Sequence, residues 1–452
     1  MNIIISGDGK VGSTLARQLS AEKHDITLID SKRAVLDASV EQLDVMAVHG
    51  NCASMSILLE AGVKTADLLI AATSADEVNL LCCTTAHGIN PNLHTIARIR
   101  NPEYTDQIYT MRNVFTLSLA VNPEHQAAIE IERLLKYPGF LRRDTFAKGR
   151  AEIVELRIEA GSKLCNVALS QMHSVIKCRV LVCAVLRSGV AAAPKGDFVL
   201  QEGDRIFVTA PRESLTVMLK NLGIITRKAR RVILCGGGRV SYYLARELED
   251  ESMDVQIIEK DAQRCVELAS MLNKACIVHA DASDHDTLER EGITSCDAMV
   301  TMTGMDEMNM IMSLYGISRK VPQVITMLDH SDDRNIIDSL NLGSIVCPKE
   351  LCCSNIVRYV RAMQNQTGAA LSVHTIADGQ AEAVEFLVDE NTKNCATALK
   401  ELKLKPGVLI ACITHGANTS IPNGDSVFVP GDAIVVVTGE RGSLQQLNDI
   451  FA

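Results

Sequence analysis

The chain has 452 residues, of which 47% are hydrophobic, only 3% are aromatic and none is tryptophan. Its length suffices for roughly three or four domains, and the shortage of aromatic rings argues against a site that stacks them on nucleic-acid bases. The formal net charge of −10 excludes a general DNA- or RNA-binding protein, because such proteins present a basic surface.

The 15 cysteines include no Cys-x-x-Cys pair, and many of them stand in apolar stretches. We therefore expect reduced, buried thiols. The first apolar strand starts at Asn2, which leaves no room for a signal peptide, and no run of about 18 apolar residues is present. The sequence predicts a cytoplasmic protein without direct membrane insertion and without a nucleic-acid partner.

The first third of the chain alternates short apolar strands with helices. Strands are expected at residues 2–6, 25–30, 45–48, 67–72 and 93–99, and helices at 12–20, 32–43 and 123–136. Buried apolar strands that alternate with helices are typical of a parallel, doubly wound sheet. A basic, polar stretch at residues 142–150 follows the last helix and indicates a domain boundary.

The next segment, residues 151–223, has a different pattern. Its first expected strand, 153–158, alternates apolar and polar residues, as a strand with one solvated face does. Further strands are expected at 179–187 and 206–209, with a turn at 194–197 between them. This segment is predicted to be a small α+β domain.

Both patterns occur twice. The segment 3–12 recurs at 232–241, and the Pro-x-Gly-Asp turn at 194–197 recurs at 422–425. The sequence thus predicts an α/β protein with two doubly wound, Rossmann-like parallel-sheet domains, each followed by a small α+β domain. The predicted domains cover residues 1–140, 141–225, 226–366 and 367–452.

A glycine motif follows the first strand and opens the first helix. In Gly7-x-Gly9-x-x-Gly12, the first glycine permits a tight turn, the second lets the backbone approach a pyrophosphate, and the third lets helix pack on strand. Asp30 ends the second strand, about 20 residues on, where an acid accepts hydrogen bonds from ribose and disfavours a 2′-phosphate, hence NADP. These features predict a site for a dinucleotide or an adenine nucleotide. The alternative is a doubly wound domain that keeps the turn without a ligand.

Other candidate residues follow the carboxyl ends of later strands, where ligands bind in open α/β sheets. Thr73 and Asp76 are compatible with capping of the next helix and with ligand contact, and both interpretations stay open. Arg98, a cation in an apolar strand, is predicted to pair with phosphate. The candidate residues of the first site are Gly7, Asp8, Gly9, Lys10, Val11, Gly12, Asp30, Asn51, Cys52, Thr73, Ser74, Asp76, Asn79 and Arg98.

The second copy of the motif is degraded. Ser241 replaces the third glycine, Glu259 replaces Asp30, and the strand that corresponds to the one with Arg98 has no arginine and is followed by Asp329. We therefore expect the second site to bind more weakly, or to prefer a ligand with less phosphate charge. Its candidate residues are Gly236, Gly238, Arg239, Val240, Glu259, Asp281 and Thr303. No catalytic residue and no metal ligand is assigned.

These motifs resemble those of the TrkA-type regulatory subunits of potassium uptake systems, the tandem form of the RCK (KTN) domain family. The resemblance covers essentially the whole chain and rests on segments 7–12, 73–79 and 96–101, on Asp30 and on the two Pro-x-Gly-Asp turns. It implies RCK N- and C-domains in alternation, with the glycines, Asp30 and Arg98 binding NAD(H) and ATP or ADP. It also implies a homo-oligomer, a tetrameric ring, docked on a membrane potassium-transporting subunit of the Trk or Ktr type. Some relatives bind cyclic dinucleotides in their C-domains, and no motif in this chain decides that point.

Three functions are compatible with a nucleotide-binding repeat. The first is a nucleotide-sensing subunit that gates potassium uptake because its ligand prefers one of two domain arrangements. The second, an NAD-dependent oxidoreductase, requires a general acid or base, but His173, His374 and His415 have no carboxylate at a telling spacing. The third, a redox-sensing transcriptional regulator, requires a DNA-binding segment and a basic face, which the sequence does not provide. We expect the first function and no enzymatic activity.

Overall fold

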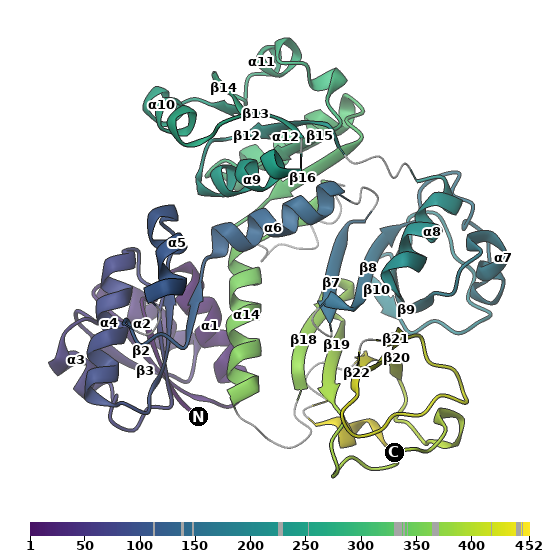
Figure 1. The fold of residues 1–452 in the computed structure, drawn as a ribbon, viewed down its shortest axis with the longest axis horizontal. Coiled ribbons are helices and arrows are strands. Elements are labelled where there is room, and N and C mark those ends of the chain that lie inside the picture. The colour runs from purple at the N-terminus through teal and green to yellow at the C-terminus, as the bar shows by residue number, and fades with distance from the viewer. Residues whose placement is uncertain are drawn as a thin grey trace. The chain divides into compact units, whose positions relative to one another are not determined.

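The computed structural model describes residues 1–111, 114–136, 140–146, 149–224, 229–251, 253–329, 337, 340, 342–363, 370–416, 418–439, 444 and 446–452. The chain forms two compact units (Figure 1): Met1–Ile129 with Cys347–Val357, here called unit 1, and Glu130–Val346 with Arg358–Ala452, here called unit 2. Two helices, α6 (Pro123–Lys136) and α14 (Pro348–Met363), contribute residues to both units.

Unit 1 contains a six-stranded parallel sheet in the order β3-β2-β1-β4-β5-β6. Its elements are β1 (Asn2–Ser6), α1 (Lys10–Ala21), β2 (Asp25–Asp30), α2 (Arg33–Gln42), β3 (Met46–His49), α3 (Met55–Glu60), β4 (Leu68–Ala71), α4 (Asp76–Ile89), β5 (His94–Arg98), α5 (Pro102–Met111) and β6 (Leu119–Val121). The strand order reverses between β1 and β4, which is where open α/β sheets bind their ligands.

The central strands of this sheet are apolar because both of their faces are covered. Ile3, Ile4 and Ile5 of β1 are at most 2% exposed, and every residue of β4 is buried. β-branched side chains fit a pleated, buried surface, and helix α4 packs on the sheet with small side chains, including Cys82 and Cys83. The buried part of this core is aliphatic, as the shortage of aromatic residues predicts.

Unit 2 repeats this sheet in the order β14-β13-β12-β15-β16-β17, again with parallel strands. Its elements are β12 (Arg231–Cys235), α9 (Arg239–Asp250), β13 (Asp254–Glu259), α10 (Ala262–Met271), β14 (Cys276–His279), α11 (His285–Arg290), η3 (Ile293–Ser295), β15 (Ala298–Thr301), α12 (Asp306–Ser318), β16 (Gln323–Met327) and β17 (Ser344–Val346). The prediction of two doubly wound parallel sheets is confirmed.

Two antiparallel sheets, one for each C-domain, complete unit 2. The first, in the order β10-β9-β11-β8-β7, comprises β7 (Arg142–Phe146), β8 (Ala151–Arg157), β9 (Leu181–Arg187), β10 (Val190–Ala192) and β11 (Arg205–Ala210), with η2 (Leu169–Gln171), α7 (Met172–Ile176) and α8 (Arg212–Leu222). The second repeats it strand for strand as β18-β19-β22-β20-β21, with β18 (Ala370–Ile376), η4 (Ala377–Gly379), β19 (Ala381–Leu387), η5 (Leu399–Glu401), β20 (Val408–His415), β21 (Asn418–Ser420), β22 (Ala433–Thr438) and η6 (Leu447–Ile450).

The two C-domains share a buried core. One apolar cluster contains Phe146 and Phe207 from the first C-domain and Ile376, Cys412 and Val435 from the second. Burial of this apolar surface stabilises the pairing of the two domains within unit 2.

The basic stretch at residues 142–150, which marks a predicted domain boundary, contains a strand. Residues Arg142–Phe146 form strand β7, which pairs with β8 in a register that sets Arg143 opposite Val154. Arg143 Nε donates to Glu152 Oε2 at 2.8 Å, and both side chains are buried. Of the predicted domain boundaries, those at 225/226 and 366/367 lie outside the described residues, as does Lys148, and the domain limits stay predictions.

Candidate nucleotide-binding site

The loop between β1 and α1 has the backbone shape that the glycine motif predicts. Gly7 has a φ of +96°, and a Cβ at this position would lie 2.8 Å from the amide nitrogen of Thr73. A Cβ on Gly12 would lie 1.9 Å from the carbonyl oxygen of Gly7, so only glycine allows this close packing of helix on loop. A Cβ on Gly9 would meet no described atom within 4 Å, which leaves space beside the loop for a ligand.

The helix that follows presents an open N-terminus. Helix α1 begins at Lys10 after the N-cap residue Gly9, and no described side chain caps it. The first N–H groups of a helix have no partner within the helix, and the helix dipole adds positive potential at this end. The start of α1 is therefore suited to a phosphate group.

Asp30 lies at the end of β2 beside this loop. Its Oδ2 accepts a hydrogen bond of 2.8 Å from the amide of Asp8, and its Oδ1 accepts one of 2.8 Å from the amide of Lys32. These bonds fix the orientation of a half-buried carboxylate, which keeps further lone pairs for ribose hydroxyl groups. The geometry agrees with the predicted role, and ribose binding itself stays a prediction.

Asp8 occupies the middle of the loop and is only 2% exposed. Neither of its carboxylate oxygens has a hydrogen-bond partner within 3.5 Å among the described residues. Burial raises the pKa of the Asp8 carboxyl group; the Ser39 hydroxyl opposes this effect and the charge of Asp30 adds to it. The sequence marked Asp8 only as part of the motif, and its burial was not foreseen.

Thr73 and Asn79 brace the turn after β4. Asn79 is fully buried, and its Oδ1 accepts hydrogen bonds from the Thr73 amide at 2.8 Å and the Thr73 hydroxyl at 2.7 Å. The Asn79 Nδ2 donates to the carbonyl oxygen of Arg98 at 2.8 Å. Neither residue caps α4, because its N-cap is Ala75 without a side-chain cap. Both side chains hold β4 and β5 together, and their contact with a ligand stays a prediction.

Asp76 has a similar structural role. One of its oxygens accepts hydrogen bonds from the amides of Arg100 at 2.8 Å and Asn101 at 2.7 Å, which fixes the turn after β5. The Arg100 guanidinium lies 3.7 Å from the other oxygen and also donates to the carbonyl oxygen of exposed Ser74. Arg100 was not among the predicted site residues, because the only signal for it in the sequence is its position two residues after Arg98.

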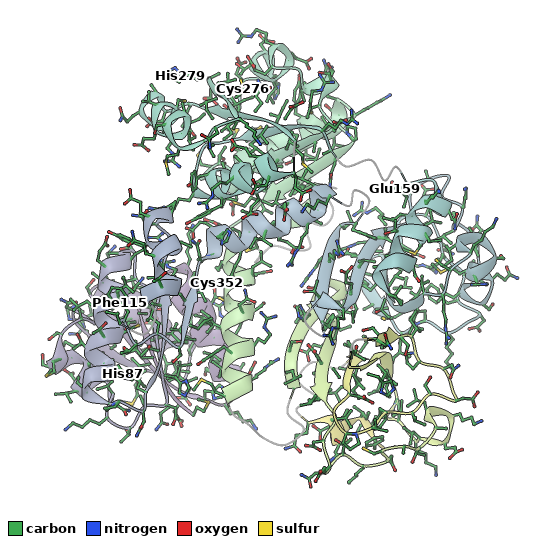
Figure 2. The ribbon with its side chains drawn as sticks, in the orientation of Figure 1. His87, Phe115, Glu159, Cys276, His279 and Cys352 are labelled. Atoms are coloured by element: carbon green, nitrogen blue, oxygen red, sulfur yellow. The ribbon has the colours of Figure 1, made fainter. Side chains whose placement is uncertain are left out.

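Arg98 is a partly buried cation beside the same turn. Its Nη2 donates to the carbonyl oxygen of Thr73 at 2.7 Å, while its buried Nε has no partner among the described residues. Burial lowers the pKa of Arg98, with a smaller contribution from Arg100, and Glu124 and Cys352 oppose it. Cys352 belongs to the part of α14 that lies in unit 1, and Figure 2 labels it.

The remaining predicted residues of the first site differ in exposure. Lys10 is exposed at the start of α1, and Val11 is buried behind it. Asn51 is exposed, and its Oδ1 accepts from the Ala53 amide at 3.0 Å, which shapes the turn before α3. Cys52 is 6% exposed, and a hydrogen bond with Cys82 lowers the pKa of its thiol. The ligand contacts assigned to these residues stay predictions.

The second glycine loop has a similar shape with a different packing. Gly236 has a φ of +105°, and Gly238 is the N-cap of α9. Ser241, which replaces the third glycine, is fully buried, and its hydroxyl donates to the carbonyl oxygen of Gly236. The second loop thus accommodates a side chain where the first would collide with one.

The acidic residue at the end of the second strand, predicted to bind ribose, and the turn after the fourth strand are also repeated. Glu259 accepts hydrogen bonds from the amides of Gly237 at 2.6 Å and Asp261 at 2.8 Å, as Asp30 does from its own loop. Asn309 Oδ1 accepts from the Thr303 amide at 2.8 Å. Of the other predicted residues, Arg239 and Asp281 are exposed and Val240 is buried. Met327, which was not a predicted site residue, stands in place of Arg98.

Two histidines of the C-domains pair with carboxylates. His374 Nδ1 lies 3.0 Å from Asp144 Oδ1, and His415 Nδ1 lies 2.6 Å from Asp432 Oδ1. Spacing in the sequence did not indicate either pair, since the partners lie 230 and 17 positions away. Both pairs join C-domain strands or turns and do not belong to a glycine loop. In the described part of the chain, no group of three or more His, Cys, Asp or Glu side chains is arranged to bind a metal ion.

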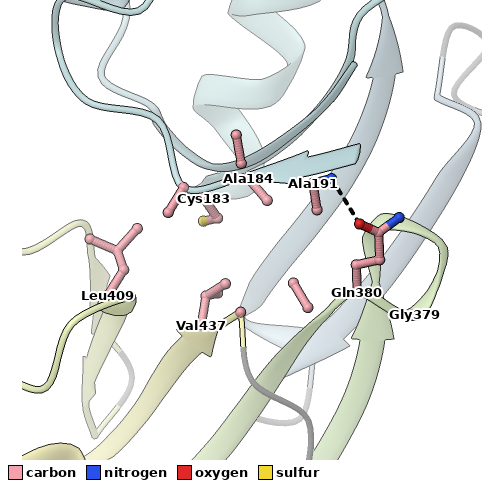
Figure 3. A pocket seen from close by; sticks show the side chains of 12 residues that line it. Cys183, Ala184, Ala191, Gly379, Gln380, Leu409 and Val437 are labelled. Atoms are coloured by element: carbon pink, nitrogen blue, oxygen red, sulfur yellow. Dashed lines mark hydrogen bonds between the residues drawn. The ribbon is translucent and has the colours of Figure 1, made fainter. Parts of the chain in front are cut away.

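A cavity of about 430 Å³ lies between the two C-domain sheets of unit 2 (Figure 3). The described residues that line it are uncharged and mostly small, and they include Cys183, Ala191 and Leu409. Gln380 closes one side, since it accepts a hydrogen bond of 2.9 Å from the Ala191 amide. None of the described residues that line it is a cation, so this described lining is poorly suited to phosphate.

Comparison with known proteins identifies related sequences and folds. The TrkA-N domain family matches residues 3–117 and 232–348, and the TrkA-C domain family matches residues 153–223. The Trk system potassium uptake protein TrkA of Haemophilus influenzae is 31% identical, over 100% of this chain and 98% of that protein. The TrkA homolog of Archaeoglobus fulgidus is 30% identical, over 100% of both chains.

Solved structures share the architecture at lower sequence identity. The crystal structure of the GsuK RCK domain has a TM-score of 0.62 and 16% identity, and covers 96% of this chain and 92% of that one. A GsuK channel bound to NAD has a TM-score of 0.60 and 16% identity, with 97% and 76% covered. No described helix is both long and apolar enough to cross a membrane. Together with the matched domains and the full-length relatives, the repeated sheets show that the chain belongs to the TrkA family of tandem RCK proteins.

Proposed function

We propose that this protein is a nucleotide-sensing regulatory subunit of a Trk-type potassium uptake system. It binds NAD(H), ATP or ADP in its first Rossmann-like domain and controls a membrane potassium-transporting partner of the Trk or Ktr type. It acts at the cytoplasmic face of the membrane, attached through that partner, as a ring of four copies. The assignment to a potassium uptake system is supported by relatives that are named potassium uptake proteins. The assignment of a nucleotide ligand is supported by a GsuK channel of the same fold that is bound to NAD.

The observation that supports nucleotide binding most directly is the convergence of two phosphate-binding features on Thr73. The Thr73 amide lies against Gly7 of the loop that opens α1, and the Thr73 carbonyl accepts a hydrogen bond from Arg98. Arg98 keeps a buried Nε without a partner among the described residues. An open helix N-terminus beside a buried, incompletely paired guanidinium favours a multiply charged phosphate ligand.

An oxidoreductase is the less favoured function. Hydride transfer to a substrate requires a proton donor or acceptor beside the nicotinamide. The histidines with carboxylate partners belong to the C-domains, where His374 and His415 link strands or turns. Asp30 and Asp76 both accept hydrogen bonds from backbone amides. Asp30 lies where a ribose is expected, and Asp76 lies at a turn, so neither lies where a substrate would be expected.

The second site is proposed to bind a ligand of lower phosphate charge. Met327 stands in place of Arg98, and the loop carries Ser241 in place of glycine. The first site would therefore fill with ATP at concentrations that leave the second site empty or occupied by a less charged nucleotide. Gating follows only if a ligand binds one arrangement of the domains more tightly than the other.

Calorimetric titration of the full chain with NAD+, NADH, ADP and ATP tests the proposal. The full chain is required because α14 supplies Cys347–Val357 to unit 1, so a fragment that ends near residue 225 would lack part of that unit. We expect saturable binding that weakens in Arg98→Met. Absence of binding by all four nucleotides would refute the ligand assignment. Potassium flux through the membrane partner, measured with and without the bound nucleotide, then tests regulation.

A further inference from the structure

The buried carboxyl group of Asp8 has no counterpart in the second half of the chain. Gly237 holds the same place in the second loop, and a Cβ built there would lie 2.7 Å from Leu268 Cδ1 and 2.9 Å from Glu259 Oε2. A side chain at this loop position therefore points toward the ribose acid and the helix after the second strand. Ser39 of α2 stands where the second copy has the buried Leu268.

The two halves thus differ by a matched pair of residues. The first half combines a carboxyl group, Asp8, with a hydroxyl group, Ser39, and the second combines Gly237 with Leu268. Burying a carboxyl group without a hydrogen-bond partner is unfavourable, so Asp8 does not serve packing alone. Its position beside Asp30 places two carboxyl groups at the ribose end of the first site.

We propose that Asp8 is a specificity-determining residue of the first site, which rejects nucleotides with an extra phosphate on the adenosine ribose. This inference rests on the proposed nucleotide binding and names the ligand class that the site excludes. The ionised Asp8 carboxylate repels a ribose 2′-phosphate through space, in addition to the repulsion from Asp30. A ribose with free hydroxyl groups meets no such penalty, because it donates hydrogen bonds to Asp30.

The discrimination should increase with pH. Burial and the Asp30 charge both favour the protonated form of Asp8, so its repulsion is weak at low pH and full at higher pH. From α2, Ser39 adds only a neutral hydroxyl group that favours the charged form. Lys32 and Arg33 at the start of α2 are exposed, and solvent and salt screen their charges.

The test measures the affinities of NAD+ and NADP+ for the full chain between about pH 4 and 8, in roughly half-unit steps. This range starts near the ordinary pKa of 3.8 above which the Asp8 pKa is raised, and it covers the ionisation of the 2′-phosphate near pH 6. The variants are Asp8→Asn, which keeps the shape, and Asp8→Gly, which copies Gly237. In wild type, the ratio of NAD+ to NADP+ affinity should rise with pH. In both variants the ratio at pH 8 should fall by about tenfold or more, and its remaining pH dependence should reflect the 2′-phosphate alone.

The outcomes separate this inference from the proposed function. If neither dinucleotide binds wild type, nucleotide binding itself fails. If NAD+ binds and both variants weaken NAD+ and NADP+ equally, Asp8 only shapes the loop and the specificity role is refuted. Thermal melts of the ligand-free variants show whether they fold. The second site carries Gly237 in every variant, so the difference between wild type and variant belongs to the first site.

Discussion

Replacing Arg98 with methionine gives the first site the residue that the second site has at position 327. A charge-assisted hydrogen bond to phosphate contributes about 1.5–3 kcal/mol to binding. Its loss should weaken the affinity for ADP or NAD by roughly 10- to 150-fold. Methionine has a similar length and fits apolar surroundings, so the strand should keep its shape.

The same substitution should change the stability of the ligand-free protein only slightly. It removes the hydrogen bond from Arg98 to the carbonyl oxygen of Thr73, which contributes about 0.5–1.5 kcal/mol. It also removes a cation that burial disfavours, since burial lowers the pKa of Arg98. The two effects oppose each other, so we expect a change in the free energy of unfolding of about 1 kcal/mol or less.

Calorimetric titration and thermal melts of the full chain separate these two effects. Arg17→Met is the matched control, because Arg17 is exposed on α1 and its replacement changes the net charge equally. We expect the control to bind like wild type and Arg98→Met to lose most of the nucleotide-induced rise in Tm. Affinity within about threefold of wild type, a difference below 1 kcal/mol, would refute the role of Arg98 as a phosphate ligand. A large loss of stability in the ligand-free variant would show instead that Arg98 mainly stabilises the position of Thr73.

Three further substitutions test other parts of the structure. Gly9→Ala should abolish nucleotide binding in titrations while Tm barely changes, because the new Cβ meets no described protein atom within 4 Å; Gly88→Ala, equally open, is the control. Burial raises the pKa of Glu130 on α6 from 4.5 to about 7, so its protonated form contributes stability below pH 4.5 that is lost as the pH rises through 7. The Tm of Glu130→Gln relative to wild type should therefore rise between pH 5 and 8, and a flat difference would contradict this reasoning. Arg358→Pro should break α14 where it passes from unit 1 to unit 2, so nucleotide binding persists while its effect on hydrogen exchange in the second Rossmann-like domain disappears. An unchanged exchange response in Arg358→Pro, or its loss also in the control Arg358→Ala, would argue against coupling through this helix.

Local signals were sufficient to predict the two parallel sheets. The strand at residues 25–30 and the helix at 123–136 have the predicted limits, because each is marked by a continuous apolar pattern and by polar or proline residues at its ends. The glycine spacing predicted the loop as well, since the tight turn at Gly7 and the close packing at Gly12 depend on backbone sterics alone. Asp30 ends the second strand as predicted, and its carboxylate accepts a hydrogen bond from the loop.

Long-range pairing could not be predicted from spacing. Strand β7 was not predicted within the basic stretch, because the carboxylate that pairs with Arg143 lies on the neighbouring strand. The carboxylate that pairs with His374 is 230 positions away. Asn79 resembled a ligand or a residue of a helix start, while its hydrogen bond to the Arg98 carbonyl joins two strands. Periodicity also gives no indication that part of α14 belongs to unit 1.

Several differences between the two halves fall at the expected ligand site. The brace after the fourth strand is the same in both copies, with 2.8 Å from the Thr73 amide to Asn79 and 2.8 Å from the Thr303 amide to Asn309. The expected ribose and phosphate positions differ, with Gly237 for Asp8 and Met327 for Arg98, and the packing position Gly12 is Ser241. A second site without any use would be expected to lose its brace and its ligand residues alike. Preservation of the brace with replacement of the contacts favours two sites of different selectivity on one chain, and such a pair lets two nucleotides act on the same conformational equilibrium.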